Sequence, residues 1–114
     1  MELISSLEKL RDKLRSYRRE DIRFNEPHFT QQMILREGSK EEVITNLLNP
    51  DNLVYFYSEP GRYGDVKYSL YFRISSTRTM KIPVILDLNR KKRIYVLTYI
   101  MRYRPWQTMI GHSR

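Results

Sequence analysis

The chain has no cysteine, two histidines and only four glycines, and it contains no long apolar run. Without cysteine it can form neither disulfides nor the usual thiolate zinc sites, and it has no thiol nucleophile. No stretch reaches the ~20 apolar residues that span a bilayer, and Glu2 and Glu8 do not fit the basic and then apolar layout of a secretion signal. We therefore expect a cytoplasmic protein that does not act at membranes.

What the chain has in excess is positive charge. Its 114 residues include 21 Lys and Arg against 13 Asp and Glu, which gives a formal charge of +8 and a pI near 9.9. A chain of this length forms about one domain with a single modest core. The excess charge attracts phosphate polymers or anionic surfaces, and it weakly favours nucleic acid as the partner.

An apolar stripe marks the first 20 residues as an amphipathic helix. Leucine or tyrosine recurs at alternating spacings of four and three, which places one side of a helix of about four turns against a partner. The stripe consists of Leu3, Leu7, Leu10, Leu14 and Tyr17. It packs either on its own domain or against a second copy in a homodimer. Two heptads are short for a coiled coil, which favours the first alternative.

The next segment predicts a short strand and a helix hairpin. Residues 22–25 alternate apolar and polar side chains, as a strand does, and Pro27 suits the first turn of a helix that stops at Gly38. Ser39 and Glu42 match a capping box, so a second helix begins there and ends near residues 49–50.

From Asn52 onwards the period changes to two. Residues 66–75 alternate strictly, which predicts a half-buried strand with Val66, Tyr68, Leu70, Phe72 and Ile74 inward. Further strands are expected at 53–57, 82–88 and 93–103, joined in an antiparallel meander. Because Pro83 cannot donate to a ladder, its strand either begins there or turns that position outward.

The predicted class is therefore α+β, with one domain over residues 21–110 after the N-terminal helix and a tail at 111–114. Helices cover one face of the sheet, and the other face is expected to carry basic and aromatic side chains. That face comprises Lys67, Tyr71, Arg73, Lys81, Tyr95 and Tyr99, and we add Arg93 and Tyr103 as nucleic-acid contacts. Interleaved cations and rings suit single-stranded RNA, although tyrosine and lysine are also ordinary occupants of a solvated sheet.

The order of these elements resembles a known fold. A short strand, a helix opening with His28, Arg36 before a glycine turn, a second helix reading SKEEV from Ser39, and then a meander are similar to the RelE-type toxins. That group also includes barnase and the colicin tRNA nucleases, and the nearest likeness is to small relatives with an H-x3-R-x3-R-G-I-S-x-E-E-V helix pair. The resemblance covers residues 22–103 and departs from the motif at Gln32 and after Gly38. It implies a metal-independent ribonuclease, often paired with an antitoxin.

Metal-independent RNA cleavage requires a base, an acid and cations around one phosphate. His28 is the natural titrating group, and on a helix it shares a side with Gln32 and Arg36. We expect Arg73 to clamp phosphate, and Tyr99 or Tyr103 to hold or donate a proton. The acidic residues are scattered and no helix carries paired histidines, so we predict no metal and no cofactor.

Two functions remain open at this point. The first is an RNA-cleaving enzyme that uses His28, Arg36, Arg73 and Tyr99, held in check by an acidic antitoxin-like protein. The second is a catalytically silent module of the same fold that binds RNA or protein, a reading favoured by the loss of the middle arginine at Gln32.

Overall fold

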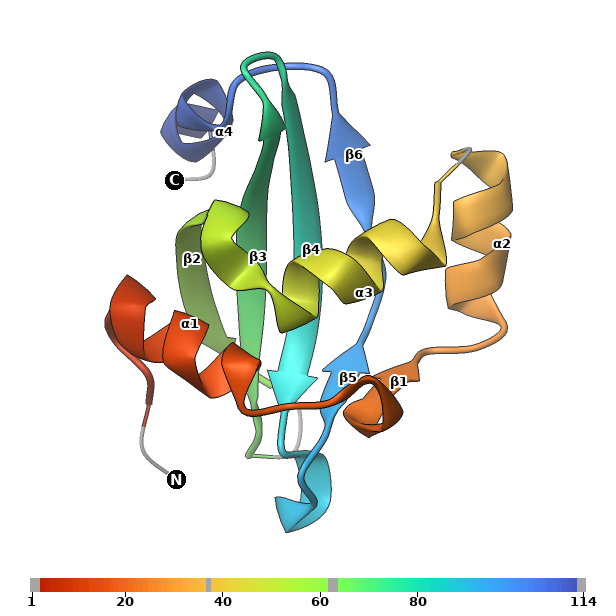
Figure 1. The fold of residues 1–114 in the computed structure, drawn as a ribbon, viewed down its shortest axis with the longest axis vertical. Helices are drawn as coiled ribbons and strands as arrows, with labels where there is room; N and C mark the ends of the chain where they lie inside the picture. The colour runs from red at the N-terminus through yellow and green to blue at the C-terminus, as the bar shows by residue number, and fades with distance from the viewer. Residues whose placement is uncertain (1–2, 37, 62–63, 113–114) are drawn as a thin grey trace.

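The computed structural model describes residues 3–36, 38–61 and 64–112 and has an α+β architecture, as predicted (Figure 1). Its helices are α1 (Leu7–Arg15), α2 (His28–Leu35), α3 (Lys40–Leu48) and α4 (Trp106–His112). Its strands are β1 (Ile22–Phe24), β2 (Leu53–Pro60), β3 (Val66–Ser75), β4 (Arg78–Leu86), β5 (Ile94–Val96) and β6 (Ile100–Arg102). Short 3-10 turns precede β1 and β2 and follow β4.

The predicted meander is present: β2, β3, β4 and β5 pair in chain order, each antiparallel to the last. β1 extends the sheet beyond β5 as a parallel strand, and β6 pairs with the first half of β4. β4 begins at Arg78, earlier than the expected Ile82, because a tight turn follows Ser75 directly. It ends at Leu86, since Asp87 adopts a left-handed conformation (φ 53°) that an extended strand does not accommodate.

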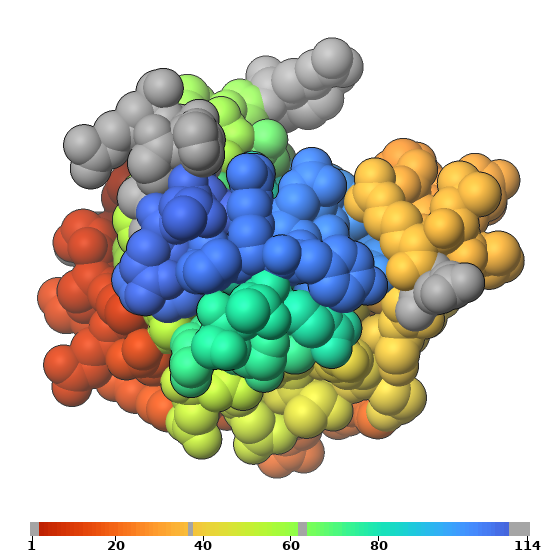
Figure 2. Space-filling model, turned by 90° about the horizontal axis from the view of Figure 1, so that it is seen from above, coloured from red at the N-terminus to blue at the C-terminus, as the bar shows by residue number. Residues whose placement is uncertain are grey.

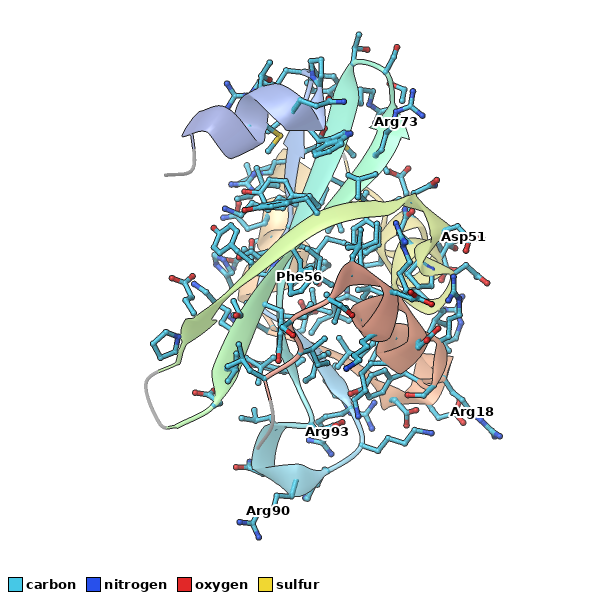
Figure 3. The ribbon with its side chains drawn as sticks, turned by 90° about the vertical axis from the view of Figure 1, so that its left-hand side faces the viewer. Arg18, Asp51, Phe56, Arg73, Arg90 and Arg93 are labelled. Carbon is cyan, nitrogen blue, oxygen red and sulfur yellow. The ribbon has the colours of Figure 1, made fainter. Side chains whose placement is uncertain are left out.

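Helices cover the sheet unequally. α1 and α3 lie on one face, α2 stands beside it, and α4 lies on the opposite face near the β3–β4 turn (Figures 1 and 3). The core fills the space between the sheet and α1 and α3, where Leu14, Leu47 and Leu70 are fully buried. We call the opposite face the outer face. Among the residues described, no helix is long and apolar enough to cross a membrane.

The N-terminal stripe packs within its own domain. Ser6 caps α1 by accepting a hydrogen bond from the Lys9 amide, so the helix begins at Leu7 rather than at Leu3. Leu10 and Leu14 are fully buried, whereas Leu3 is 56% exposed. The leucines that a homodimer through this helix would use are therefore already covered by the chain's own core.

In the helix hairpin α3 begins at its predicted cap, whereas α2 ends at Leu35, before the expected Gly38. Ser39 accepts a hydrogen bond from the Glu42 amide at the start of α3. α2 buries Phe29 and Met33, whereas Ile34 is 73% exposed. Because α2 stands beside the sheet rather than over it, only a narrow stripe of this helix finds a partner (Figure 1).

The predicted strand 93–103 is broken in two, and the break changes which face its tyrosines occupy. Val84 pairs with Val96 and Lys81 with Ile100, so three residues of the later segment stand opposite two of β4. One extra residue reverses the alternation of side chains after it. Tyr99 consequently enters the core, 1% exposed and against the ring of Phe29, instead of lying on the outer face.

Pro83 stands opposite this break. The Pro83 carbonyl accepts a hydrogen bond from the Leu97 amide. In an extended residue the amide N–H and the carbonyl point toward the same neighbouring strand, but proline has no N–H to donate. Pro83 therefore stands where the regular pairing of β4 with the later segment is interrupted, so its lack of an N–H breaks no ladder hydrogen bond.

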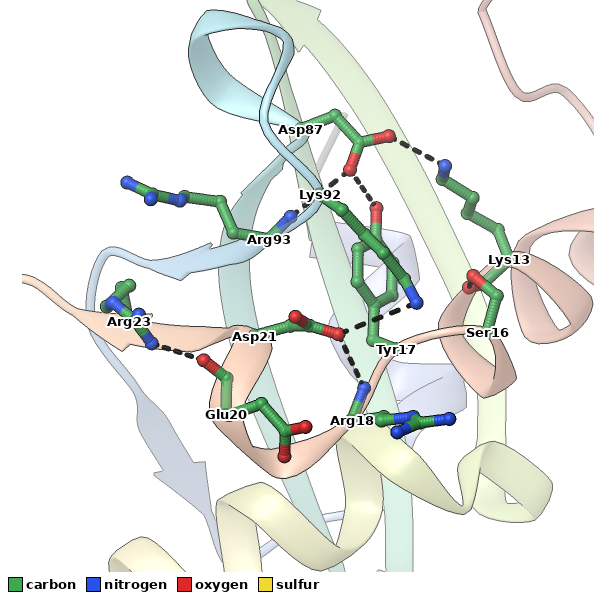
Figure 4. Close-up of polar contacts among 10 residues, drawn as sticks. All are labelled: Lys13, Ser16, Tyr17, Arg18, Glu20, Asp21, Arg23, Asp87, Lys92 and Arg93. Carbon is green, nitrogen blue, oxygen red and sulfur yellow. Dashed lines mark hydrogen bonds and ion pairs between the residues drawn. The ribbon is translucent and has the colours of Figure 1, made fainter.

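A polar network fastens α1 to the turn after β4 (Figure 4). Asp87 accepts hydrogen bonds from the Tyr17 hydroxyl at 2.7 Å and the Arg93 amide at 3.3 Å, and it forms an ion pair with Lys13 at 2.6 Å. Burial raises the pKa of the Tyr17 hydroxyl, and Asp87 raises it further. The network therefore links the end of α1 and the segment after it to the turn after β4.

Candidate functional site

The outer face brings three tyrosines and a lysine into contact. The register places Tyr55 beside Tyr71 and Tyr71 beside Lys81, with Tyr57 next to this row. We call these four residues the tyrosine–lysine cluster. Tyr71 and Lys81 were predicted from the sequence for this face, whereas Tyr55 and Tyr57 were not, although their spacing of two residues on β2 places them on one side of that strand.

Lys81 is the centre of the cluster. Its ammonium donates a hydrogen bond to the Tyr57 hydroxyl at 3.0 Å and lies 5.3 and 5.5 Å from the ring centroids of Tyr57 and Tyr71. The rings of Tyr55 and Tyr71 meet edge to face at 5.4 Å. The lysine side chain is therefore held over two aromatic rings rather than left free in solvent.

These contacts shift two protonation equilibria. Partial burial alone raises the pKa of the Tyr57 hydroxyl, but hydrogen bonds from Lys81, Ser69 and Tyr71 outweigh it and lower that pKa below 10.0. Partial burial lowers the pKa of Lys81, but the two tyrosines outweigh it and raise that pKa above 10.5. At neutral pH the pair is a phenol bonded to an ammonium, with a phenol that loses its proton more readily than usual.

The rest of the predicted outer face is only partly accessible. Tyr71 is 1% exposed, since its neighbours in the cluster surround it and α4 packs against β3 on this side. Lys67 forms an ion pair with Glu59 at 2.7 Å, and the Tyr95 hydroxyl donates to Asn25 at 3.1 Å. Tyr55, Tyr57 and Lys81 therefore offer the more accessible rings and charge.

The four residues predicted for catalysis do not converge. Arg36 and Tyr99 meet: the Arg36 guanidinium donates to the Tyr99 carbonyl, and both line a small pocket. His28 is exposed at the other end of α2, about 12 Å away along the helix axis. Arg73 is exposed near the β3–β4 turn, at the opposite end of the molecule from Arg93 (Figure 3).

The pocket is lined by residues that were predicted from the sequence as site residues and by others, such as Arg78, that were not. Tyr103, 75% exposed, lies beside Arg78, whose guanidinium is 5.5 Å from the tyrosine ring centroid. Burial raises the pKa of the Tyr99 hydroxyl despite the nearby Arg36, so this tyrosine keeps its proton and is a poor base. Arg78 was not predicted because it precedes residue 82, where the next strand was expected to begin.

Within the ranges that the structure describes, no group of three or more His, Asp or Glu side chains is arranged to hold a metal ion. Comparisons with family models, curated proteins and solved structures find no match for this chain.

Proposed function

We propose that the chain binds single-stranded RNA across the outer face. The observation that carries this proposal is the tyrosine–lysine cluster on the outer face, in which Lys81 is held over two tyrosine rings. Aromatic rings stack on unpaired bases, at about 1–3 kcal/mol per base, and the ammonium neutralises phosphate. The formal charge of +8 supports the same class of partner at longer range.

The RelE-like arrangement belongs to this proposal as well. Two helices on one face of an antiparallel meander are compatible with that fold, and a cytoplasmic RNA partner agrees with the absence of cysteine. An acidic antitoxin-like protein stays a prediction; a basic surface of this kind suits it electrostatically.

Metal-independent cleavage is the second candidate, and the Tyr57–Lys81 pair is the observation that favours it. The lowered pKa of Tyr57 increases the fraction of phenolate, which can take the proton of a ribose 2′-hydroxyl as the 2′-oxygen attacks phosphorus. The bond from phosphorus to the 5′-oxygen then breaks, and the adjacent Lys81 ammonium can stabilise the charged phosphorane and donate a proton to the leaving 5′-oxygen. In this form of the proposal Tyr57 and Lys81 take the roles of titrating group and phosphate clamp, which the sequence predicted for His28 and Arg73.

One set of variants tests both candidates. Fluorescence anisotropy with labelled single-stranded RNA measures binding, and the same RNA incubated with EDTA is analysed for 2′,3′-cyclic phosphate ends. Lys81→Met should weaken binding by about tenfold, since it removes a phosphate contact and loosens both rings. Lys9→Met, which removes the same charge from exposed α1 on the far face, should change affinity less than about twofold.

Tyr57→Phe separates the two functions. The ring remains for stacking, so binding should persist, whereas cleavage should fall by about a hundredfold if the hydroxyl is the base. Equal weakening by Lys81→Met and Lys9→Met would overturn binding at the outer face. Cleavage that survives in Tyr57→Phe and is lost in His28→Ala would place the chemistry on α2 instead.

A further inference from the structure

The small pocket beside Tyr99 contains none of the residues of the tyrosine–lysine cluster. It lies where the end of α2, the start of α3, the first residue of β4 and the segment after β6 meet, at the end of the molecule seen in Figure 2. Its volume is about 60 Å³, room for a few waters or one tetrahedral oxyanion. Its lining residues are Arg36, Gly38, Ser39, Glu42, Arg78, Tyr99, Met101 and Tyr103.

Two arginines, Arg36 and Arg78, make the pocket basic. The Arg36 guanidinium is anchored by its bond to the Tyr99 carbonyl, which leaves its remaining N–H groups for another acceptor. The Nε of Arg78 is buried and has no hydrogen-bond acceptor among the residues described. Neither arginine forms an ion pair with a carboxylate in that part of the chain. A buried donor without an acceptor calls for a ligand or water that accepts.

We propose that this pocket binds a phosphomonoester carried by a nucleoside, either a free nucleotide or the phosphorylated end of an oligonucleotide. Guanidinium groups match phosphate oxygens in forked, charge-assisted hydrogen bonds. Ser39, the N-cap of α3, also lines the pocket, so the positive end of that nine-residue helix faces the same space. The pocket is too small for a base, which instead stacks on the exposed ring of Tyr103 at its rim.

This site is separate from the tyrosine–lysine cluster. Tyr99 lines it from the core side of the sheet, whereas Lys81 belongs to the outer face, so either site can fail without the other. Glu42 is the acidic member of the pocket. Its negative charge repels a bound phosphate dianion. Replacing Glu42 with a neutral residue should therefore increase the affinity for the phosphomonoester.

Isothermal titration of the full chain tests the proposal with four probes: a nucleoside 5′-monophosphate, the matching nucleoside, inorganic phosphate, and one single-stranded RNA with a 5′-phosphate, a 3′-phosphate or free hydroxyl ends. The monophosphate should bind about tenfold or more tightly than the nucleoside. Arg36→Met and Arg78→Met should each remove this difference, and Glu42→Gln should increase the affinity by about two- to fivefold. Arg104→Met, an exposed neighbour of Tyr103 that does not line the pocket, should preserve it.

The probes also identify the source of the phosphate. A preference for one phosphorylated RNA end over free ends assigns the pocket to RNA termini, and binding of the monophosphate without that preference assigns it to free nucleotides. Equal affinity for nucleotide and nucleoside, or a phosphate preference retained in both Arg36→Met and Arg78→Met at unchanged melting temperature, would overturn the proposal. RNA bound normally through Lys81 in those variants would leave the outer-face function standing.

Discussion

Asp87 shows how a single carboxylate stabilises this fold. Partial burial raises the pKa of Asp87, but hydrogen bonds from Lys13 and Tyr17 and the nearby Lys13 charge outweigh it and hold that pKa below 3.8. A carboxyl group with a lowered pKa in the folded state stabilises the protein above its unfolded pKa, and this stabilisation disappears as the pH falls through the folded pKa.

Asp87→Asn should therefore lower the free energy of unfolding by about 1 kcal/mol at pH 7, after allowance for partial solvent screening. Asparagine tolerates the left-handed backbone at this position (φ 53°), so the change removes charge without new strain. Urea unfolding of both proteins from pH 7 down to pH 2 measures the difference, which should shrink at low pH. Asp12→Asn, on an exposed carboxylate paired within α1, is the matched control; a pH-independent loss in Asp87→Asn would contradict this account.

At the scale of elements, α1 shows what an amphipathic stripe does in so small a domain. Its inward leucines complete the core over β2 and α3, whereas Leu3 precedes the helix and stays exposed. Leu14→Ala should cost about 2–5 kcal/mol because it leaves a cavity in a fully buried position. Leu3→Ala should change stability by less than about 0.5 kcal/mol. Thermal unfolding of the two variants checks this, and equal melting temperatures would show that α1 is not part of the core.

Many of the helices and strands were predictable from the sequence, because helix caps and the alternation of apolar and polar residues depend only on residues close together in the chain. Ser39 as a cap and residues 66–75 as a strand are of this kind, and both are confirmed. The break at Tyr99 was not predictable, because one extra residue opposite β4 becomes visible only when two strands are aligned. The same reason hid the pocket: Arg36, Arg78 and Tyr103 come from distant segments, and no spacing in the sequence relates them.

At the scale of the whole molecule, the formal charge of +8 predicts how RNA binding responds to salt. Each phosphate neutralised by the protein releases counterions, so the logarithm of affinity falls linearly with the logarithm of salt, by about 0.7 per contact for a single strand. The cations of the outer face include Lys67, Lys81 and Arg102, of which Lys67 is already paired with Glu59. Two to three contacts correspond to a slope of roughly −1.4 to −2.1.

Affinity should then fall by roughly seven- to twentyfold between 50 and 200 mM salt, which anisotropy titrations at several concentrations can measure. Lys81→Met should make the slope shallower by about 0.7, because it removes one phosphate contact, while Lys9→Met should weaken binding slightly and leave the slope unchanged. This pair distinguishes a defined interface from diffuse attraction, since a chain that binds through net charge alone responds equally to the loss of either lysine. A flat salt dependence, with affinity intact at high salt, would mean that stacking on Tyr55 and Tyr57 holds the strand without phosphate contacts.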